Sequence, residues 1–105
     1  NVKKGATVSN SVVFADSIIE ENAVVDLAIL DRRVYVGAGS RVGDGDGLDV
    51  ANKKFPTHLY TGISLIGKEA MIPPGVRIGR NCIVNFGFHD GSFGGKTVLA
   101  DGESI

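Results

Sequence analysis

The chain has 105 residues, 15 of them glycine, and a formal charge of −1 at neutral pH. This length suits one domain, and the low net charge gives no electrostatic case for nucleic acid or an anionic membrane as a partner. A single cysteine excludes a disulfide within the chain, and no apolar stretch is long enough to span a bilayer. We therefore expect a cytoplasmic, single-domain protein. Because the chain starts at Asn1 and not at Met, we also expect a piece of a longer protein.

A short repeat begins at Ala6, after a polar lead-in over residues 1–5. Its aliphatic residues are spaced by five or six positions, and neither a helix nor an alternating strand has that period. The pattern recurs after 17 residues, so Val8 corresponds to Val25 and Val25 to Val42. A fixed short repeat predicts a solenoid, here with coils of three short sides. The aliphatic residues predicted to point inward are Val8, Val13, Ile19, Val25, Leu30, Val36 and Val42.

Small residues stand two positions before these aliphatics, as Ser17 and Ala23 do before Ile19 and Val25. Two positions apart in a strand means the same face, so the small residues also point inward, near the corners. Gly, Asn and Asp at the turns tolerate left-handed backbone angles. The predicted fold is all-β: a single-stranded left-handed parallel β-helix, or hexapeptide-repeat solenoid, with one ejected loop and a C-terminal cap. The left-handed coils of this class are an exception to the right-handed crossover rule.

A charged, glycine-rich loop over residues 43–61 interrupts the repeat. Loops of this length in a compact solenoid are usually functional or disordered. The repeat resumes through Ile66, Ile72, Ile78 and Val84, so the coils are expected over residues 6–42 and 62–88 of the single domain 1–105. Residues 89–105 are predicted to form an irregular cap over the open end. The aromatic residues predicted to plug that end are Phe86, Phe88 and Phe93.

Two histidines are the first candidates for chemistry: His58 in the loop and His89 in the cap. Hexapeptide-repeat acyltransferases use a histidine base, and related carbonic anhydrases bind a metal through histidines. Two histidines cannot supply a three-histidine zinc site within one chain. A structural role is favoured for each. A free-standing acyltransferase, active between protomers of a trimer with His58 or His89 as base, remains the alternative function.

Other candidate residues favour structural interpretations. Asp44, Asp46 and Asp49 have the wrong spacing for a calcium-binding loop, and Phe55 stands where such a loop needs Glu. They are therefore predicted to form a solvated turn, without a metal. Cys82 occupies a small inward position and is predicted to be a buried filler, not a nucleophile.

Several basic residues are expected at corners and in the loop. A solvated prism surface is one interpretation, and a site for a phosphorylated effector or a docking face for another domain is the other. Because the coils stack, some of these side chains could lie one above another. The candidate effector or domain-docking residues are Arg32, Arg33, Arg41, Lys53 and Lys54.

Four segments carry a resemblance to a known family: N-S-V-V-F at 10–14, S-I-I-E-E-N-A-V-V at 17–25, A-I-L-D-R-R-V-Y-V-G at 28–37 and I-G-K-E-A-M-I-P-P-G-V-R-I-G-R-N at 66–81. Together they resemble the C-terminal tail of glucose-1-phosphate adenylyltransferases, the ADP-glucose pyrophosphorylases of glycogen and starch synthesis. The third segment is the most specific, because plain hexapeptides occur in many families.

The resemblance implies the regulatory and oligomerisation domain of a sugar nucleotidylyltransferase. In that family an N-terminal α/β domain makes ADP-glucose and pyrophosphate from ATP and glucose 1-phosphate with Mg²⁺, and the β-helix tail packs on it. The implied partners are that N-terminal catalytic domain, further copies in a homo-oligomer and a phosphorylated small-molecule effector. Catalytic residues, a metal site and a cofactor are not expected in this domain, and Mg²⁺ is expected in the catalytic domain.

Overall fold

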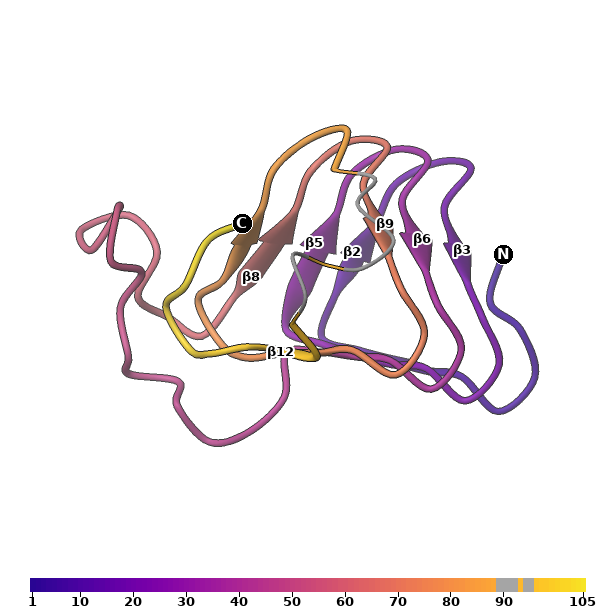
Figure 1. The fold of residues 1–105 in the computed structure, drawn as a ribbon, viewed down its shortest axis with the longest axis horizontal. Coiled ribbons are helices and arrows are strands. Elements are labelled where there is room, and N and C mark those ends of the chain that lie inside the picture. The colour runs from indigo at the N-terminus through magenta and orange to yellow at the C-terminus, as the bar shows by residue number, and fades with distance from the viewer. Residues whose placement is uncertain (89–92, 94–95) are drawn as a thin grey trace.

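The computed structural model describes residues 1–88, 93 and 96–105. In this part of the chain, short strands follow one another around a three-sided prism, with the N-terminal coil at one end and the C-terminal coil at the other (Figure 1). The strands are β1 (Thr7–Ser9), β2 (Val12–Val13), β3 (Ile18–Ile19), β4 (Val24–Asp26), β5 (Ala28–Leu30), β6 (Tyr35–Val36), β7 (Arg41–Val42), β8 (Ser64–Ile66), β9 (Met71–Ile72), β10 (Arg77–Ile78), β11 (Ile83–Val84) and β12 (Val98–Leu99).

Each side of the prism is one parallel sheet. The five-stranded sheet has the order β1-β4-β7-β10-β12, the four-stranded sheet β11-β8-β5-β2 and the three-stranded sheet β3-β6-β9. Consecutive strands belong to different sheets, and each pairs with the strand one coil further along. The predicted 17-residue register is confirmed, since Val8 pairs with Val25 and Val25 with Val42. The predicted left-handed parallel β-helix is thereby confirmed as the fold.

The core fills the inside of the prism, as the alternation of side chains predicts. The inward aliphatics Val25, Val36, Val42, Ile72 and Ile78 are completely buried. The small inward residues are buried as well, and three of them are serines whose hydroxyls bridge successive coils. Their Oγ atoms donate to carbonyl oxygens of the next coil: Ser17 to Asp31 at 2.8 Å, Ser40 to Pro73 at 2.6 Å and Ser64 to Gly79 at 2.8 Å. Each buried hydroxyl therefore has a partner, as buried polar groups require.

The corners need residues that accept left-handed backbone angles. The prediction holds for Asn10, Asp16 and Asn22, whose φ angles are 51°, 63° and 61°. It is wrong for Gly37, which instead allows two coils to approach closely. A Cβ atom at Gly37 would lie 2.4 Å from the backbone nitrogen of Pro74 in the next coil. Glycine is needed there for space and not for its φ angle.

The loop over residues 43–61 leaves the prism at the corner between β7 and β8 (Figure 1). Two buried asparagines hold it in place. The Nδ2 atom of Asn81 donates to the carbonyl oxygens of Leu48 (3.1 Å) and Val50 (2.7 Å), and its Oδ1 accepts from the backbone N–H of Gly62 at 2.8 Å. The Nδ2 atom of Asn52 donates to the carbonyl oxygen of Asn81 at 2.9 Å. The loop is thus attached to the prism by side-chain hydrogen bonds inside the protein.

The C-terminal residues differ from the irregular cap expected over 89–105. β12 pairs with β10, and Ser104 forms an isolated parallel bridge with Ile83, so residues 98–105 continue the coil. Phe93 is buried and makes an edge-to-face contact with Phe88, with ring centroids 5.4 Å apart, as a plug requires. The assignment of Phe86 to the plug is wrong: its side chain is 81% exposed because it follows β11 at an outward turn position.

Candidate functional site

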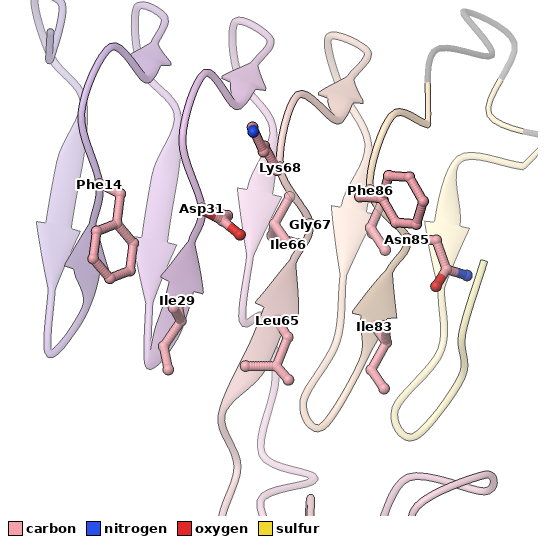
Figure 2. Close-up of a pocket in the computed structure, with 11 residues that line it drawn as sticks. Phe14, Ile29, Asp31, Leu65, Ile66, Gly67, Lys68, Ile83, Asn85 and Phe86 are labelled. Atoms are coloured by element: carbon pink, nitrogen blue, oxygen red, sulfur yellow. The ribbon is translucent and has the colours of Figure 1, made fainter.

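The outward face of the four-stranded sheet is apolar. Val12, Ile29, Leu65 and Ile83 are register partners on β2, β5, β8 and β11. Because the neighbouring residue in each strand points into the core, these four point outward. A groove of about 330 Å³ lies over this face, with Ile29, Leu65 and Ile83 in its lining (Figure 2). An apolar groove on a sheet face is a candidate contact surface.

Aromatic and charged side chains border this groove along one edge. Phe14 and Phe86 lie toward its two ends, and Asp31 and Lys68 lie between them (Figure 2). Gly67 stands between these side chains and contributes none of its own. A Cβ atom there would lie 2.4 Å from the backbone nitrogen of Phe86, so the close approach of the next coil requires glycine. The groove is therefore deepest in chemistry at its centre, where an acid, a base and a bare backbone meet.

The loop forms the opposite border. A second hollow of about 260 Å³ is lined by Phe55, His58 and Leu59 of the loop and by Leu65 and Ile83 of the sheet. The Nδ1 atom of His58 lies 3.2 Å from the Oγ1 atom of Thr57, and no carboxylate is bonded to this ring within residues 1–88, 93 and 96–105. His89, the other candidate base, lies outside the described residues.

An ion pair fixes the corner from which the loop leaves. The Nη1 atom of Arg80 lies 3.0 Å from the Oδ2 atom of Asp26, and the Nε atom of Arg80 donates to the carbonyl oxygen of Gly45 at 2.9 Å. The Oδ1 atom of Asp26 accepts from Ser9 at 2.9 Å and from Asn10 at 3.2 Å. These hydrogen bonds, that from Ser9 first, and the Arg80 charge lower the pKa of Asp26 below its ordinary value of 3.8.

The five predicted effector or docking residues lie in three separate places. Arg32 and Arg33 occupy the corner between β5 and β6, where the Nε atom of Arg33 pairs with the Oε2 atom of Glu69 at 3.0 Å. Arg41 lies on β7, on the outside of the five-stranded sheet, directly beside Arg77 of β10. A single pocket does not bring all five together.

Lys53 and Lys54 lie in the loop. The Nζ atom of Lys53 pairs with the Oε1 atom of Glu103 at 3.1 Å, and the backbone N–H of Lys54 donates to the Oδ1 atom of Asn52 at 2.9 Å. The structure therefore associates these two lysines with the attachment of the loop to the last coil. Their role toward an effector stays a prediction.

Cys82 is completely buried, which confirms its predicted inward position. Burial raises the pKa of its thiol to about 11, so the thiolate needed by a nucleophile does not form at neutral pH. Among the described residues, no group of three or more His, Cys, Asp and Glu side chains is placed to hold a metal ion. Asp44 of the predicted turn lies 3.9 Å from the Nη1 atom of Arg41.

The comparison with known proteins agrees with the repeat. The sequence pattern of the GlmU-like, C-terminal hexapeptide family matches residues 1–66. The chain belongs to this family. No solved structure gives a significant match. In the described part of the chain, no helix has the length and apolar character needed to cross a membrane.

Curated relatives of this chain carry one name. A glucose-1-phosphate adenylyltransferase of Thermomicrobium roseum is 43% identical over 96 residues, which cover 91% of this chain and 22% of the relative. Proteins with the same name from Acetivibrio thermocellus and Pseudothermotoga lettingae are 36% and 39% identical over 80% and 82% of this chain, covering 19% and 24% of those relatives. The predicted resemblance is thus confirmed. The chain spans about a fifth of the length of the relatives it matches.

The buried asparagines are the functional side chains that sequence reasoning missed. Asn81 had a usable signal: it stands at the same corner as Asn10, and both have positive φ angles. Asn52 had none, because it lies inside the loop, where the six-residue period is lost. Hydrogen bonds between distant segments cannot be read from a local pattern.

Proposed function

We propose that this chain is the C-terminal regulatory and oligomerisation domain of a sugar nucleotidylyltransferase of the glucose-1-phosphate adenylyltransferase type, acting in the cytoplasm in glycogen or related polysaccharide synthesis. The observation that carries the proposal is the shared name of three relatives that are 36–43% identical over most of this chain.

The proposed division of labour places the chemistry elsewhere in the protein. An N-terminal catalytic domain would bind ATP, glucose 1-phosphate and Mg²⁺ and release ADP-glucose and pyrophosphate. This chain would supply a rigid support, and the described residues favour that role. His58 has a threonine neighbour but no carboxylate, and the Cys82 thiol stays protonated. The apolar groove over Ile29, Leu65 and Ile83 suits contact with protein and not with a charged nucleotide.

The activity test uses the natural protein that carries this chain. We expect the purified protein to form ADP-glucose and pyrophosphate from ATP and glucose 1-phosphate in the presence of Mg²⁺, and residues 1–105 alone to form none. Acyl transfer by residues 1–105, lost on His58→Ala or His89→Ala, would contradict the proposal and favour the free-standing acyltransferase.

The regulatory role has its own test at the corner between β5 and β6. We expect Arg32→Ala and Arg33→Ala in the natural protein to shift the concentration of a phosphorylated effector, such as a sugar bisphosphate, that gives half-maximal activation. Because Arg33 also pairs with Glu69, the matched control is Glu69→Ala, which breaks the ion pair and keeps the guanidinium. Activation curves that stay unchanged in both arginine variants would remove this corner from the effector site.

A further inference from the structure

Two rows of side chains run along the edge where the four-stranded sheet meets the three-stranded sheet. The first row holds the residue that follows each strand of the four-stranded sheet, and the second row holds the next residue. Backbone hydrogen bonds keep the rows in register: Arg33 N–H donates to the Ala15 carbonyl at 3.1 Å and Glu69 N–H to the Arg32 carbonyl at 2.9 Å. In coil order the first row is Phe14, Asp31, Gly67 and Asn85, and the second is Ala15, Arg32, Lys68 and Phe86.

This edge is complementary to itself under twofold rotation. An axis that meets the edge between its second and third coils reverses the coil order and exchanges the two rows. Phe14 then faces Phe86 of a second copy, and Asp31 faces Lys68 of the second copy. The long side chain of Arg32 faces the bare backbone at Gly67. Every contact occurs twice, as an isologous interface requires.

The side chains concerned are free to make these contacts. Phe14 and Phe86 are 47% and 81% exposed, although both are large aromatic residues. None of the ion pairs found among the described residues involves Asp31, Arg32 or Lys68. The Oδ1 atom of Asp31 accepts only from the neighbouring backbone N–H of Arg32, at 2.7 Å. Opposite charges between two aromatic contacts are a pattern that gives an interface its register.

The outside of the five-stranded sheet shows that such a match is not a property of every face. Its central outward residue is Arg41 of β7, flanked by Val24 and Arg77. A twofold axis through the middle of this sheet would place Arg41 against Arg41 of the second copy. Two like charges in direct contact disfavour association. The edge with Phe14 and Phe86 is therefore the better candidate for contact between copies.

We propose that two copies of this chain dock along this edge, with Phe14 against Phe86 and Asp31 against Lys68 across a twofold axis. The contact runs over four coils, or about 14 Å at a strand spacing of 4.8 Å. So short a contact lies at the small end of protein interfaces and needs other contacts of the assembly to be tight. The inference deepens the proposed function, since it rests on the homo-oligomer proposed there and names the surface that the copies share.

A photo-cross-link tests the arrangement in the natural protein. The photoreactive phenylalanine analogue p-benzoylphenylalanine replaces Phe14, and copies grown in light and heavy isotopes are mixed, so that a cross-link between copies is distinguished from one within a copy. We expect mixed light–heavy cross-links from position 14 to the peptide that contains Phe86. The same analogue at Phe55, in the loop, is the control and should not mark that peptide. An absence of the Phe14–Phe86 cross-link overturns the proposal, and ADP-glucose synthesis measured separately shows whether the proposed function stands without it.

Charge reversal tests the pairing independently. Asp31→Lys places two lysines against each other, and Lys68→Asp places two aspartates together, so each change should lower the cross-link yield about tenfold, or 1.4 kcal/mol. The double variant restores opposite charges and should restore the yield. Arg77→Asp, on the five-stranded sheet, is the matched control and should leave it unchanged. A double variant that cross-links no better than the single ones overturns the pairing.

Discussion

At the scale of single residues, Cys82 shows how burial changes the chemistry of a side chain. Its pKa of about 11 in the folded chain lies above its ordinary value of 9.0 because the thiolate would lose its hydration inside the prism. The stability from the neutral thiol is fully present below pH 9 and is lost as the pH rises from 9 to about 11, where only the unfolded chain deprotonates.

We therefore expect the urea midpoint of the protein to fall in that alkaline range more than the midpoint of Cys82→Ala, with denaturation followed by circular dichroism. The native protein should also react with a thiol reagent only when urea unfolds it. Rapid labelling at neutral pH without denaturant would show that Cys82 is not enclosed.

Asp26 gives the opposite dependence on pH. Hydrogen bonds from Ser9 and Asn10 and the charge of Arg80 hold its pKa below 3.8. Its contribution to the free energy of unfolding is thus present above pH 3.8 and is lost as the pH falls through the lower folded pKa. We expect Asp26→Asn to lower the unfolding free energy at neutral pH, by about 1–3 kcal/mol for lost bonds to a charged group. The difference from the unchanged protein should vanish in acid. An equal loss at all pH values would show that packing, and not charge, stabilises this corner.

At the scale of elements, two neighbouring glycines separate space from backbone angle. A Cβ atom at Gly37 would lie within 3 Å of three backbone atoms of residues 72–74, whereas a Cβ atom at Gly39 would meet nothing within 4 Å. Gly39 has a φ of +69°, so Gly39→Ala should cost only the left-handed strain, about 1–2 kcal/mol. Gly37→Ala should cost about 3 kcal/mol because two coils must move apart. Equal losses in urea denaturation would refute the close approach.

The loop has an element-scale test at its attachment. Asn81→Ala removes three hydrogen bonds to the loop and leaves buried backbone groups without partners, so we expect a loss of about 3 kcal/mol. The freed loop should be cut by trypsin after Lys53 or Lys54 while the prism stays intact. Asn85→Ala is the control, since that exposed side chain donates only to the carbonyl oxygen of Ile105. Trypsin resistance equal to that of the unchanged protein would mean that Asn81 does not hold the loop.

The elements that sequence reasoning predicted well are those that repeat. Val25, Val42 and Ile78 follow a fixed period, and their inward orientation follows from strand geometry alone. β12 escaped prediction because an insertion shifts it to 21 residues after β10, away from the period of the earlier coils. The groove edge escaped for a different reason: Phe14 and Phe86 are 72 residues apart, and only the stacking of coils puts them on one edge.

The basic residues illustrate the same limit for the candidate site. Their position outside the core was predictable, because charged side chains are rarely buried without a partner. Their grouping was not, because it depends on which coil and which side each one occupies. Arg33 meets Glu69 from a coil 36 residues later, and Lys53 meets Glu103 from the last coil, 50 residues later. Periodicity gives the coil positions, but the partners across the inserted loop come only from the folded chain.

At the scale of the whole molecule, the prism is closed more completely at one end than at the other. Val8 and Val13 in the first coil are only partly buried, whereas Phe93 and Leu99 are enclosed at the C-terminal end. In a solenoid each coil is stabilised by its neighbours, so a terminal coil that is packed on one side contributes less than a central one.

The asymmetry predicts a gradient of stability along the prism axis. Val36→Ala, at a fully buried central position, should lower the free energy of unfolding by about 2–3 kcal/mol, since it leaves a cavity that the surrounding coils cannot fill. Val13→Ala, the same chemical change in the first coil, should cost about 1 kcal/mol because its side chain is already partly hydrated. Amide exchange should be faster in β2 than in β6 for the same reason. Equal losses at the two valines would mean that the first coil is packed as tightly as the centre, and then something outside residues 1–105 would have to cover it.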